Sequence, residues 1–320
     1  MNDFIGCCNI PDPPEYTNKE YWDKATQLYI QAPNKFSGPA YIFFEDYLWE
    51  YFKFCLTCSN RYFFQHPLIP YLESVFQKHT IVLSKGTEIH RARLDEDYKL
   101  QNEWCDYQSI KTTPETIKKI EKFNGHTVDI KTLQEKYESD YFKRIKKRIE
   151  SGFQGFDAQG STAPPTEKAS AGRCNLKGVS YLYAALEEHT AVAEIRPHIT
   201  DTISIAVLKP LRDLKLINFD YNPEDPVEGK DFIFNDIQKD FSLINRDQSN
   251  DYTITQYVTS LIEHLGYDGL CFRSSLVDDG TNYVIFNPED CNVDSSKLCL
   301  LSKVIYDYGQ FKESPQHIII

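Results

Sequence analysis

The stretch "GRCNLKGVSYLYAALEEHTAVAEIRPHI", residues 172–199, joins a turn-rich beginning to a short apolar run that contains an acid. That acid is Glu194, in the sequence AVAEI. A carboxylate among small apolar side chains is either paired or functional, because burying an uncompensated charge is costly. The same stretch carries Arg173 and Tyr183, so three candidate functional residues lie close together in the chain.

The composition is that of a soluble globular protein. The chain has 320 residues, of which 41% are hydrophobic and 26% charged, which allows one large domain or two moderate ones. The net charge of −12 argues against a nucleic-acid or anionic-membrane partner. No stretch approaches the roughly 18 uncharged apolar residues of a membrane span. The start, "MNDFIGCCNI", lacks the pattern of a secretion signal.

Residues 1–80 are predicted to form a helical N-terminal scaffold or interaction domain. Thr17 followed by Glu20 has the capping-box spacing of a helix start. The segment "AYIFFEDYLWEYFKFCL" is apolar almost all round, which predicts a helix sandwiched between other elements. "IPYLESVFQKHTIVL" gives another amphipathic turn or two of helix, which Gly86 is expected to break.

The nine cysteines are odd in number and irregularly spaced, which is typical of a reducing cytosol and predicts a cytoplasmic location. Cys55 and Cys58 have CxxC spacing, and Cys7 and Cys8 are candidate partners for zinc. The aromatic context of Cys55 and Cys58 instead favours structural burial, because free cysteine behaves as a small core hydrophobe. We therefore expect no metal.

Residues 81–300 are predicted to form an α+β domain with a largely antiparallel sheet, followed by a C-terminal tail at 301–320. A short strand at Thr87–Ala92 would place Arg91 and Arg93 on one face. Residues 111–160 form an insertion or long-loop region that includes a charged surface helix. The Gly-, Ala-, Ser- and Pro-rich segment 152–173 is predicted to be a site-forming loop. Further strands are expected at 202–208, 214–219, 269–275 and 282–286, a helix at 255–266, and a turn at Asp279-Gly280.

The common catalytic motifs GxGxxG, Walker A, HExxH and GxSxG are missing from the sequence. What remains is a scattered polar set in apolar or loop contexts: Arg91, Arg173, Tyr183, Glu194 and Ser274. Taken singly, each has a structural interpretation, such as an ion pair, a core tyrosine or a strand end. It is their arrangement along the chain that favours a site.

Three segments resemble the RES domain family, which is named for an arginine, a glutamate and a serine. They are "GTEIHRAR", "APPTEKASAGRCNLKGVSYLYAALEEHTAVAEIRP" and "TITQYVTSLIEHLGYDGLCFRSS…TNYVIF", so the resemblance covers residues 86–288. It implies an ADP-ribosyltransferase-like fold preceded by a helical domain. It also implies NAD+ as a substrate, with no bound cofactor and with inorganic phosphate as a possible co-substrate. The best-described members are toxins of bacterial toxin–antitoxin pairs that deplete NAD+ by hydrolysis or phosphorolysis, so an antitoxin or immunity partner is implied, and we expect a homo-oligomer.

Position by position, the family's named residues fall on Arg91, Glu194 and Ser274, and its motif tyrosine falls on Tyr183. Ser275 lies next to Ser274, so the register of the serine stays open by one residue. The resemblance implies that Glu194 stabilises the cationic ribose formed as nicotinamide leaves, and that Arg91 grips the pyrophosphate.

The other roles concern binding. Ser274 could donate to a phosphate or ribose oxygen, and Tyr183 offers a flat ring to nicotinamide. Arg173 could hold inorganic phosphate or close over the ligand.

Two other functions stay open. A mono-ADP-ribosyltransferase would break the same bond but pass ADP-ribose to a protein target. A non-catalytic module would hold a nucleotide or a partner without turning it over, since fold alone does not establish function.

Overall fold

The computed structural model describes residues 18–31, 39–60, 63–95, 150–199, 201–220, 232–242 and 252–304. The expected surface helix and most of the predicted 111–160 insertion lie outside these ranges, as do Cys7, Cys8 and Thr17.

The chain begins with three helices, α1 (Lys19–Gln31), α2 (Pro39–Thr57) and α3 (Leu68–Lys78). In α1 the buried residues recur at i, i+3, i+4 and i+7 and so form one face: Trp22, Ala25, Thr26 and Tyr29. The cap of α1 is Asn18, whose Oδ1 accepts from the backbone N–H of Tyr21 at 3.2 Å. The helix start therefore lies one residue later than the Thr17 cap predicts.

The end of α3 differs from the expectation of a continuous helix. The helix ends at Lys78, and strand β1 (Thr80–Leu83) follows at once. The sequence of β1, TIVL, has three β-branched residues in a row, which favour a strand. β1 pairs antiparallel with β5 (Leu214–Phe219), so the sheet supplies its hydrogen bonds.

The centre of the molecule is an eight-stranded sheet in the order β1-β5-β6-β7-β3-β2-β4-β8. Its other members are β2 (Ile89–Leu94), β3 (Leu182–Ala185), β4 (Thr202–Pro210), β6 (Gly269–Arg273), β7 (Thr281–Ile285) and β8 (Cys291–Leu300). β5 and β6 run parallel and all other neighbours run antiparallel. This confirms the α+β class and the largely antiparallel sheet. β2 lies two residues later than expected, and β3 and β8 were not predicted.

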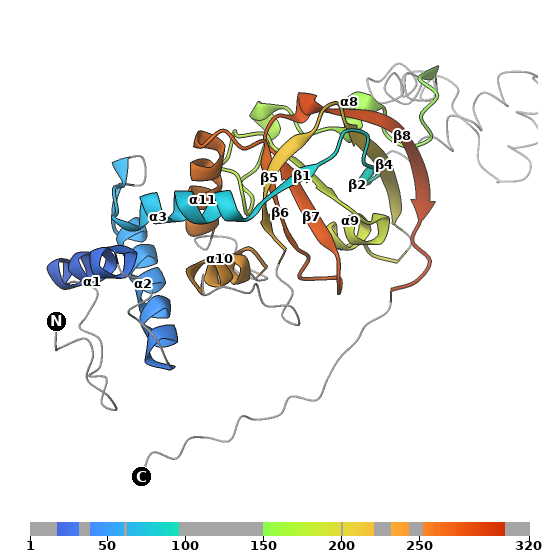
Figure 1. Ribbon diagram of the computed structural model, residues 1–320. Helices are drawn as coiled ribbons and strands as arrows, with labels where there is room; N and C mark the ends of the chain where they lie inside the picture. Colours follow the sequence, from blue (N-terminus) through green and yellow to red (C-terminus); the bar gives the residue numbers. More distant parts are fainter. Residues whose placement is uncertain are drawn as a thin grey trace, which may run out of the picture.

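One face of the sheet is covered by helices in two layers. α10 (Phe232–Ser242) and α11 (Thr253–His264) lie between the sheet and the N-terminal helices (Figure 1). One hydrophobic cluster runs through all three layers, from Trp49 of α2 through Phe241 of α10 to Phe272 of β6. Trp49 Nε1 also donates to Asp240 Oδ2 at 2.9 Å. The N-terminal helices thus share a core with the sheet, and their division from it at residue 80 stays a prediction.

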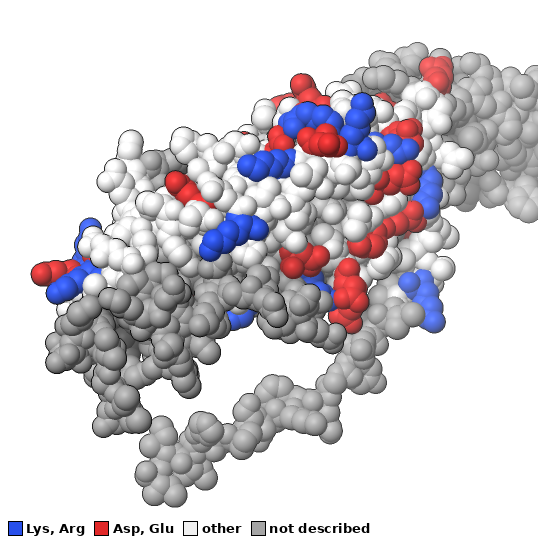
Figure 2. Space-filling view, viewed as in Figure 1, with Lys and Arg blue, Asp and Glu red and all other residues white. Residues whose placement is uncertain are grey.

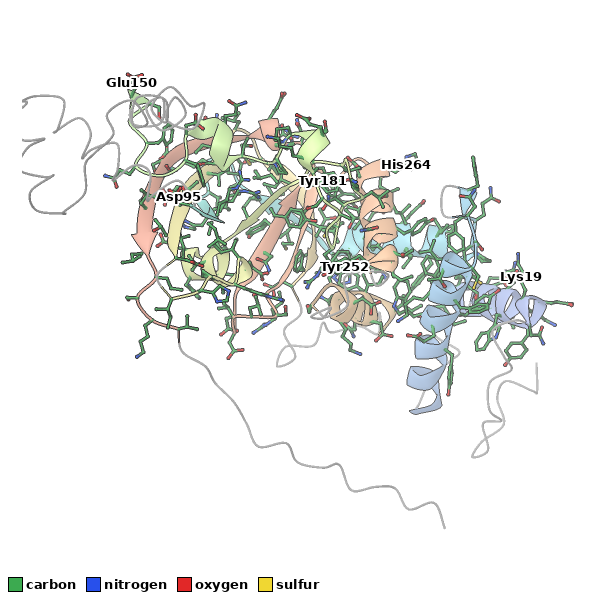
Figure 3. The ribbon with its side chains drawn as sticks, turned by 180° about the vertical axis from the view of Figure 1, so that it is seen from behind. Lys19, Asp95, Glu150, Tyr181, Tyr252 and His264 are labelled. Atoms are coloured by element: carbon green, nitrogen blue, oxygen red, sulfur yellow. The ribbon has the colours of Figure 1, made fainter. Side chains whose placement is uncertain are left out.

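The tyrosine Tyr181, labelled in Figure 3, joins the chain before β3 to α11. Its hydroxyl donates to Glu263 Oε2 at 2.6 Å. The opposite face of the sheet is covered by the short helix α8 (Ala158–Ser161) and its flanking loop. There Arg93 Nη1 donates to the carbonyl oxygen of Gly160 at 2.5 Å.

Charged side chains of both signs are mixed on the surface seen in Figure 2, over the part that holds the sheet. Within the described ranges, no helix has the length and apolar character needed to cross a membrane.

Candidate active site

Helix α9 (Glu188–Glu194) carries the candidate glutamate at its last position. The helix start is attached to β7 by Glu187, whose Oε2 accepts from Thr190 Oγ1 at 3.0 Å and from the backbone N–H of Thr281 at 3.1 Å. The helix also approaches Gly280 closely, because a Cβ there would lie 2.6 Å from Thr190 Oγ1. Glu194 lies one turn beyond Thr190, so it extends the face of α9 that packs on the sheet.

The candidate serine follows strand β6. Ser274 is buried, and its backbone N–H donates to the carbonyl oxygen of Gly280 at 2.7 Å. The predicted turn before β7 is confirmed, with Asp279 in the left-handed region at φ 61°. The Ser274 hydroxyl accepts from the backbone N–H of Leu276 at 3.1 Å and donates to Glu194 Oε1 at 2.8 Å. This contact favours Ser274 over Ser275 as the functional serine.

The surroundings of Glu194 differ from those that its neighbours in sequence suggest. Ala191 is buried, but Glu194 is exposed. The expectation of a carboxylate enclosed by apolar side chains is therefore wrong. The reason is the helix end, since Glu194 is the last residue of α9 and no further turn of the helix covers it. The carboxylate is oriented by hydrogen bonds, from Ser274 and from Asn282 Nδ2 at 2.6 Å, and not by an apolar enclosure.

The strand register places further residues on the face that Glu194 adjoins. Asn282 of β7 pairs with Phe272 of β6 on one side and with Ala185 of β3 on the other. Paired residues of antiparallel strands share a face, and side chains alternate along a strand. Tyr183, two residues before Ala185, therefore lies on this face as well.

Tyr183 and Arg173 hold the loop 172–175 against this face. The Tyr183 hydroxyl donates to Asn175 Oδ1 at 2.7 Å and accepts from the backbone N–H of Cys174 at 3.1 Å. Burial raises the pKa of Tyr183, so the phenol is neutral and can donate. Arg173 lies with its guanidinium carbon 5.1 Å from the centre of the Phe272 ring, and it donates to the carbonyl oxygen of Phe241 at the end of α10. Both residues thus have structural partners.

Arg91 lies where strands β2 and β3 separate. His90 and Ala185 are the single pair recorded between these strands. Farther along β3, the carbonyl oxygen of Tyr183 accepts from Arg91 Nη1 at 2.6 Å. Ala92 packs with Ala185 beneath α9, so by strand alternation the Arg91 side chain belongs to the other face of the sheet.

Among the described residues, no acid forms a salt bridge with the Arg91 guanidinium. Its Nε is buried and, in the described part of the chain, has no hydrogen-bond partner. Burial, with a smaller contribution from the positive charge of Arg93, lowers the pKa of Arg91 to about 10, so the group stays protonated at neutral pH. A buried positive charge that lacks a carboxylate is suited to an anionic ligand.

The structure thus brings Glu194 and Ser274 together and places Tyr183 on the same face. It links Arg91 to this group through the Tyr183 backbone, and no hydrogen bond or ion pair joins Arg91 to Glu194 in the residues described. Asn282 is a site residue that sequence reasoning missed. A signal was present in the sequence, because Asn282 is a polar residue directly before the apolar run YVIF.

The CxxC pair Cys55 and Cys58 lies at the end of α2. Cys55 is half-buried in α2, but Cys58 lies past the helix end and is exposed, so the expected burial of Cys58 is wrong. In the part of the chain that the structure describes, no group of three or more His, Cys, Asp or Glu side chains could hold a metal ion.

Comparison with known proteins identifies the domain that carries this site. Residues 142–298 match the family model of the RES domain. The chain therefore contains a RES domain. The matched segment includes Tyr183, Glu194, Ser274 and Asn282, whereas Arg91 lies before its first residue. No curated protein matches the chain.

Among solved structures, the chain is similar to one chain of the M. tuberculosis MbcT–MbcA toxin–antitoxin complex. The two are 11% identical, the match covers 43% of this chain and 76% of the other, and the TM-score is 0.30. At that TM-score the likeness carries no argument about function.

Proposed function

We propose that the protein is an enzyme that cleaves the nicotinamide–ribose bond of NAD+. The observation that carries the proposal is the carboxylate of Glu194, held by Ser274 at the end of α9 within a RES domain. One oxygen of this carboxylate is fixed by donors, and the residue is otherwise open to a ligand.

The chemistry requires an anion near the ribose. When the bond from ribose C1′ to the nicotinamide nitrogen breaks, its electron pair goes to that nitrogen, and positive charge develops on the ribose as in glycoside cleavage. Nicotinamide leaves as a neutral molecule, so no general acid is needed. A preorganised carboxylate stabilises the charge that develops in the transition state. The oxygen of water or of inorganic phosphate then bonds to C1′, and a water molecule that attacks loses its proton to solvent.

We propose that Arg91 binds the pyrophosphate. The support is its guanidinium at the separation of β2 and β3, whose Nε is buried and has no hydrogen-bond partner among the described residues. NAD+ is an extended molecule, so its pyrophosphate can lie several ångströms from the ribose that contacts Glu194. A guanidinium supplies two parallel donors to phosphate oxygens. Because the Arg91 side chain belongs to the other face of the sheet, this role requires the dinucleotide to pass between the faces where β2 and β3 separate.

We further propose that this activity serves a toxin or defence effector in the cytoplasm that an antitoxin or immunity protein restrains. The support is the RES domain itself.

The test is a product assay on the purified full chain with NAD+, with and without phosphate, and with and without cell protein. Chromatography separates nicotinamide, ADP-ribose and its phosphate ester, and labelled NAD+ reports transfer to protein. We expect nicotinamide with free ADP-ribose, or with its phosphate ester when phosphate is present. Labelled protein without free ADP-ribose would identify a transferase. Binding of NAD+ with no release of nicotinamide would contradict the proposal and identify a binding module.

A further inference from the structure

The two oxygens of Glu194 have different surroundings. Oε1 accepts from Ser274 Oγ at 2.8 Å and from Asn282 Nδ2 at 2.6 Å. Oε2 has no hydrogen bond or ion pair to any residue in the described part of the chain. Because both donors converge on one oxygen, the carboxylate plane is fixed and Oε2 is the oxygen left for a ligand.

The donor on Asn282 is set more rigidly than the donor on Ser274. A serine hydroxyl can rotate to suit its acceptor. Asn282 is 6% exposed and lies within β7, between Phe272 of β6 and Ala185 of β3. Its amide nitrogen faces Glu194, since an ionised carboxylate offers acceptors and no donor.

The backbone next to Asn282 is also fixed. The side chain of the preceding residue, Thr281, donates to Asp220 Oδ2 at 2.9 Å, and its backbone N–H donates to Glu187 Oε2. Glu187 precedes α9, and Glu194 ends it. The first two residues of β7 therefore contact both ends of the helix and fix where its last residue lies.

We infer that Asn282 is a positioning residue that, together with Ser274, orients Glu194 so that Oε2 meets the ribose of the dinucleotide. The contact between Oε2 and the ribose rests on the proposed function. The orientation of Glu194 by Asn282 rests on geometry alone. Misplacing a catalytic group by about 1 Å can cost about 100-fold in rate. Asn282 acts through Glu194 and does not itself touch the reacting atoms.

The first test is Asn282→Asp, which keeps the shape of the side chain and replaces the donor by a second carboxylate beside Glu194. We expect kcat for nicotinamide release to fall about 100-fold, with KM changed less than about threefold, because the substrate-binding groups are untouched. Asn287→Asp is the matched control, since Asn287 lies two residues past the other end of β7 and is exposed, and the aspartate keeps an acceptor for the backbone N–H of Glu289. The control should keep full turnover.

A second readout separates positioning from a general structural effect. In a Glu194→Gln background, Asn282→Asp should lower turnover by less than about threefold, because the group that it orients is already lost. A further loss as large as in the wild-type background would overturn the inference. So would a fall in turnover that is matched by a loss of thermal stability and shared by Asn287→Asp.

A crystal structure of Asn282→Asp decides the orientation without any turnover. We expect an intact sheet with the Glu194 carboxylate displaced by 1 Å or more, an order of displacement at which catalysis suffers. A carboxylate that stays on Ser274 in its original place would overturn the inference. If the wild-type protein released no nicotinamide, the proposed function would fail, and this structure would still decide whether Asn282 orients Glu194.

Discussion

Ser274 donates a hydrogen bond of 2.8 Å to Glu194, although 80 positions separate the two residues in the chain. The contact joins the end of helix α9 to the end of strand β6, and β7 lies beside both. The ends of two central strands thus hold an otherwise exposed acid in one orientation, which is what electrostatic stabilisation of a transition state requires.

Substitution of the two adjacent serines should separate the one that functions from its neighbour. Ser274→Ala removes a buried donor to a charged group, which costs about 1.5–3 kcal/mol, or roughly 10–150-fold in turnover. Ser275→Ala is the matched control and should leave turnover within about twofold. Steady-state nicotinamide release measures both. A larger loss for Ser275→Ala would shift the functional register by one residue.

Arg91 and Arg93 occupy alternate positions along β2. Substitutions at the two positions should differ in their effect on the affinity for NAD+. Arg91→Lys keeps the charge but loses the planar pair of donors, so we expect KM for NAD+ to rise by about tenfold or more. Arg93 donates to Gly160 and lies beside the ring of Phe156. Arg93→Lys should therefore lower stability more than affinity. Equal KM values for the two variants would contradict a pyrophosphate role for Arg91.

His66 should make the helical end of the molecule sensitive to acid. Burial lowers the pKa of His66 from 6.5 to about 4, because its ring is enclosed by Tyr51, Phe52 and Phe64. A pKa below its unfolded value means that the unfolded chain binds the proton first. Stability is therefore intact above pH 6.5 and falls as the pH drops towards 4, by about 3 kcal/mol in total.

Urea unfolding at pH 7.5 and pH 5 measures this loss. His66→Asn keeps an acceptor for the backbone N–H of Leu68 and should flatten the pH dependence. The exposed His264 serves as the control, and His264→Asn should leave the slope unchanged. An unchanged slope in His66→Asn would show that other groups cause the acid sensitivity.

The N-terminal helices should be needed for folding of the sheet domain. A chain that begins at Thr80 would expose the side of α10 that carries Asp240 and packs against α2. We expect this shortened chain to aggregate or to melt without a cooperative transition by circular dichroism. A milder version is Trp49→Phe, which leaves Asp240 without its 2.9 Å donor and should cost about 1–3 kcal/mol. Cooperative melting of the shortened chain at the full-length midpoint would show that the sheet domain folds independently of residues 1–79.

The elements that sequence reasoning predicts correctly are those with strong local signals. The helix at Thr253–His264 has a clear apolar period, and the turn at Asp279 has a residue type that tolerates positive φ. β3 was missed because four residues are too few to show a period. β8 was missed because its sequence, CNVDSSKLCL, is half polar and takes its form from pairing with β4.

The candidate site was predictable from the sequence only in part. The RES-like spacing leads to Arg91, Glu194 and Ser274, but it does not reveal which of them meet. The exposure of Glu194 depends on where α9 ends, and its partner Asn282 depends on a strand register that joins distant segments. Such pairings are set by tertiary structure and leave little trace in a single sequence.

The most direct measurement is nicotinamide release by wild-type protein and by Glu194→Gln, with Glu188→Gln of the same helix as the control. Glu194→Gln keeps the shape and removes the charge, so it should bind NAD+ with unchanged affinity and lose about 100- to 1000-fold in kcat. Glu188, which pairs with Lys297 at 2.7 Å, should be replaceable with little effect on the rate. Wild-type release that Glu194→Gln leaves unchanged would contradict the account.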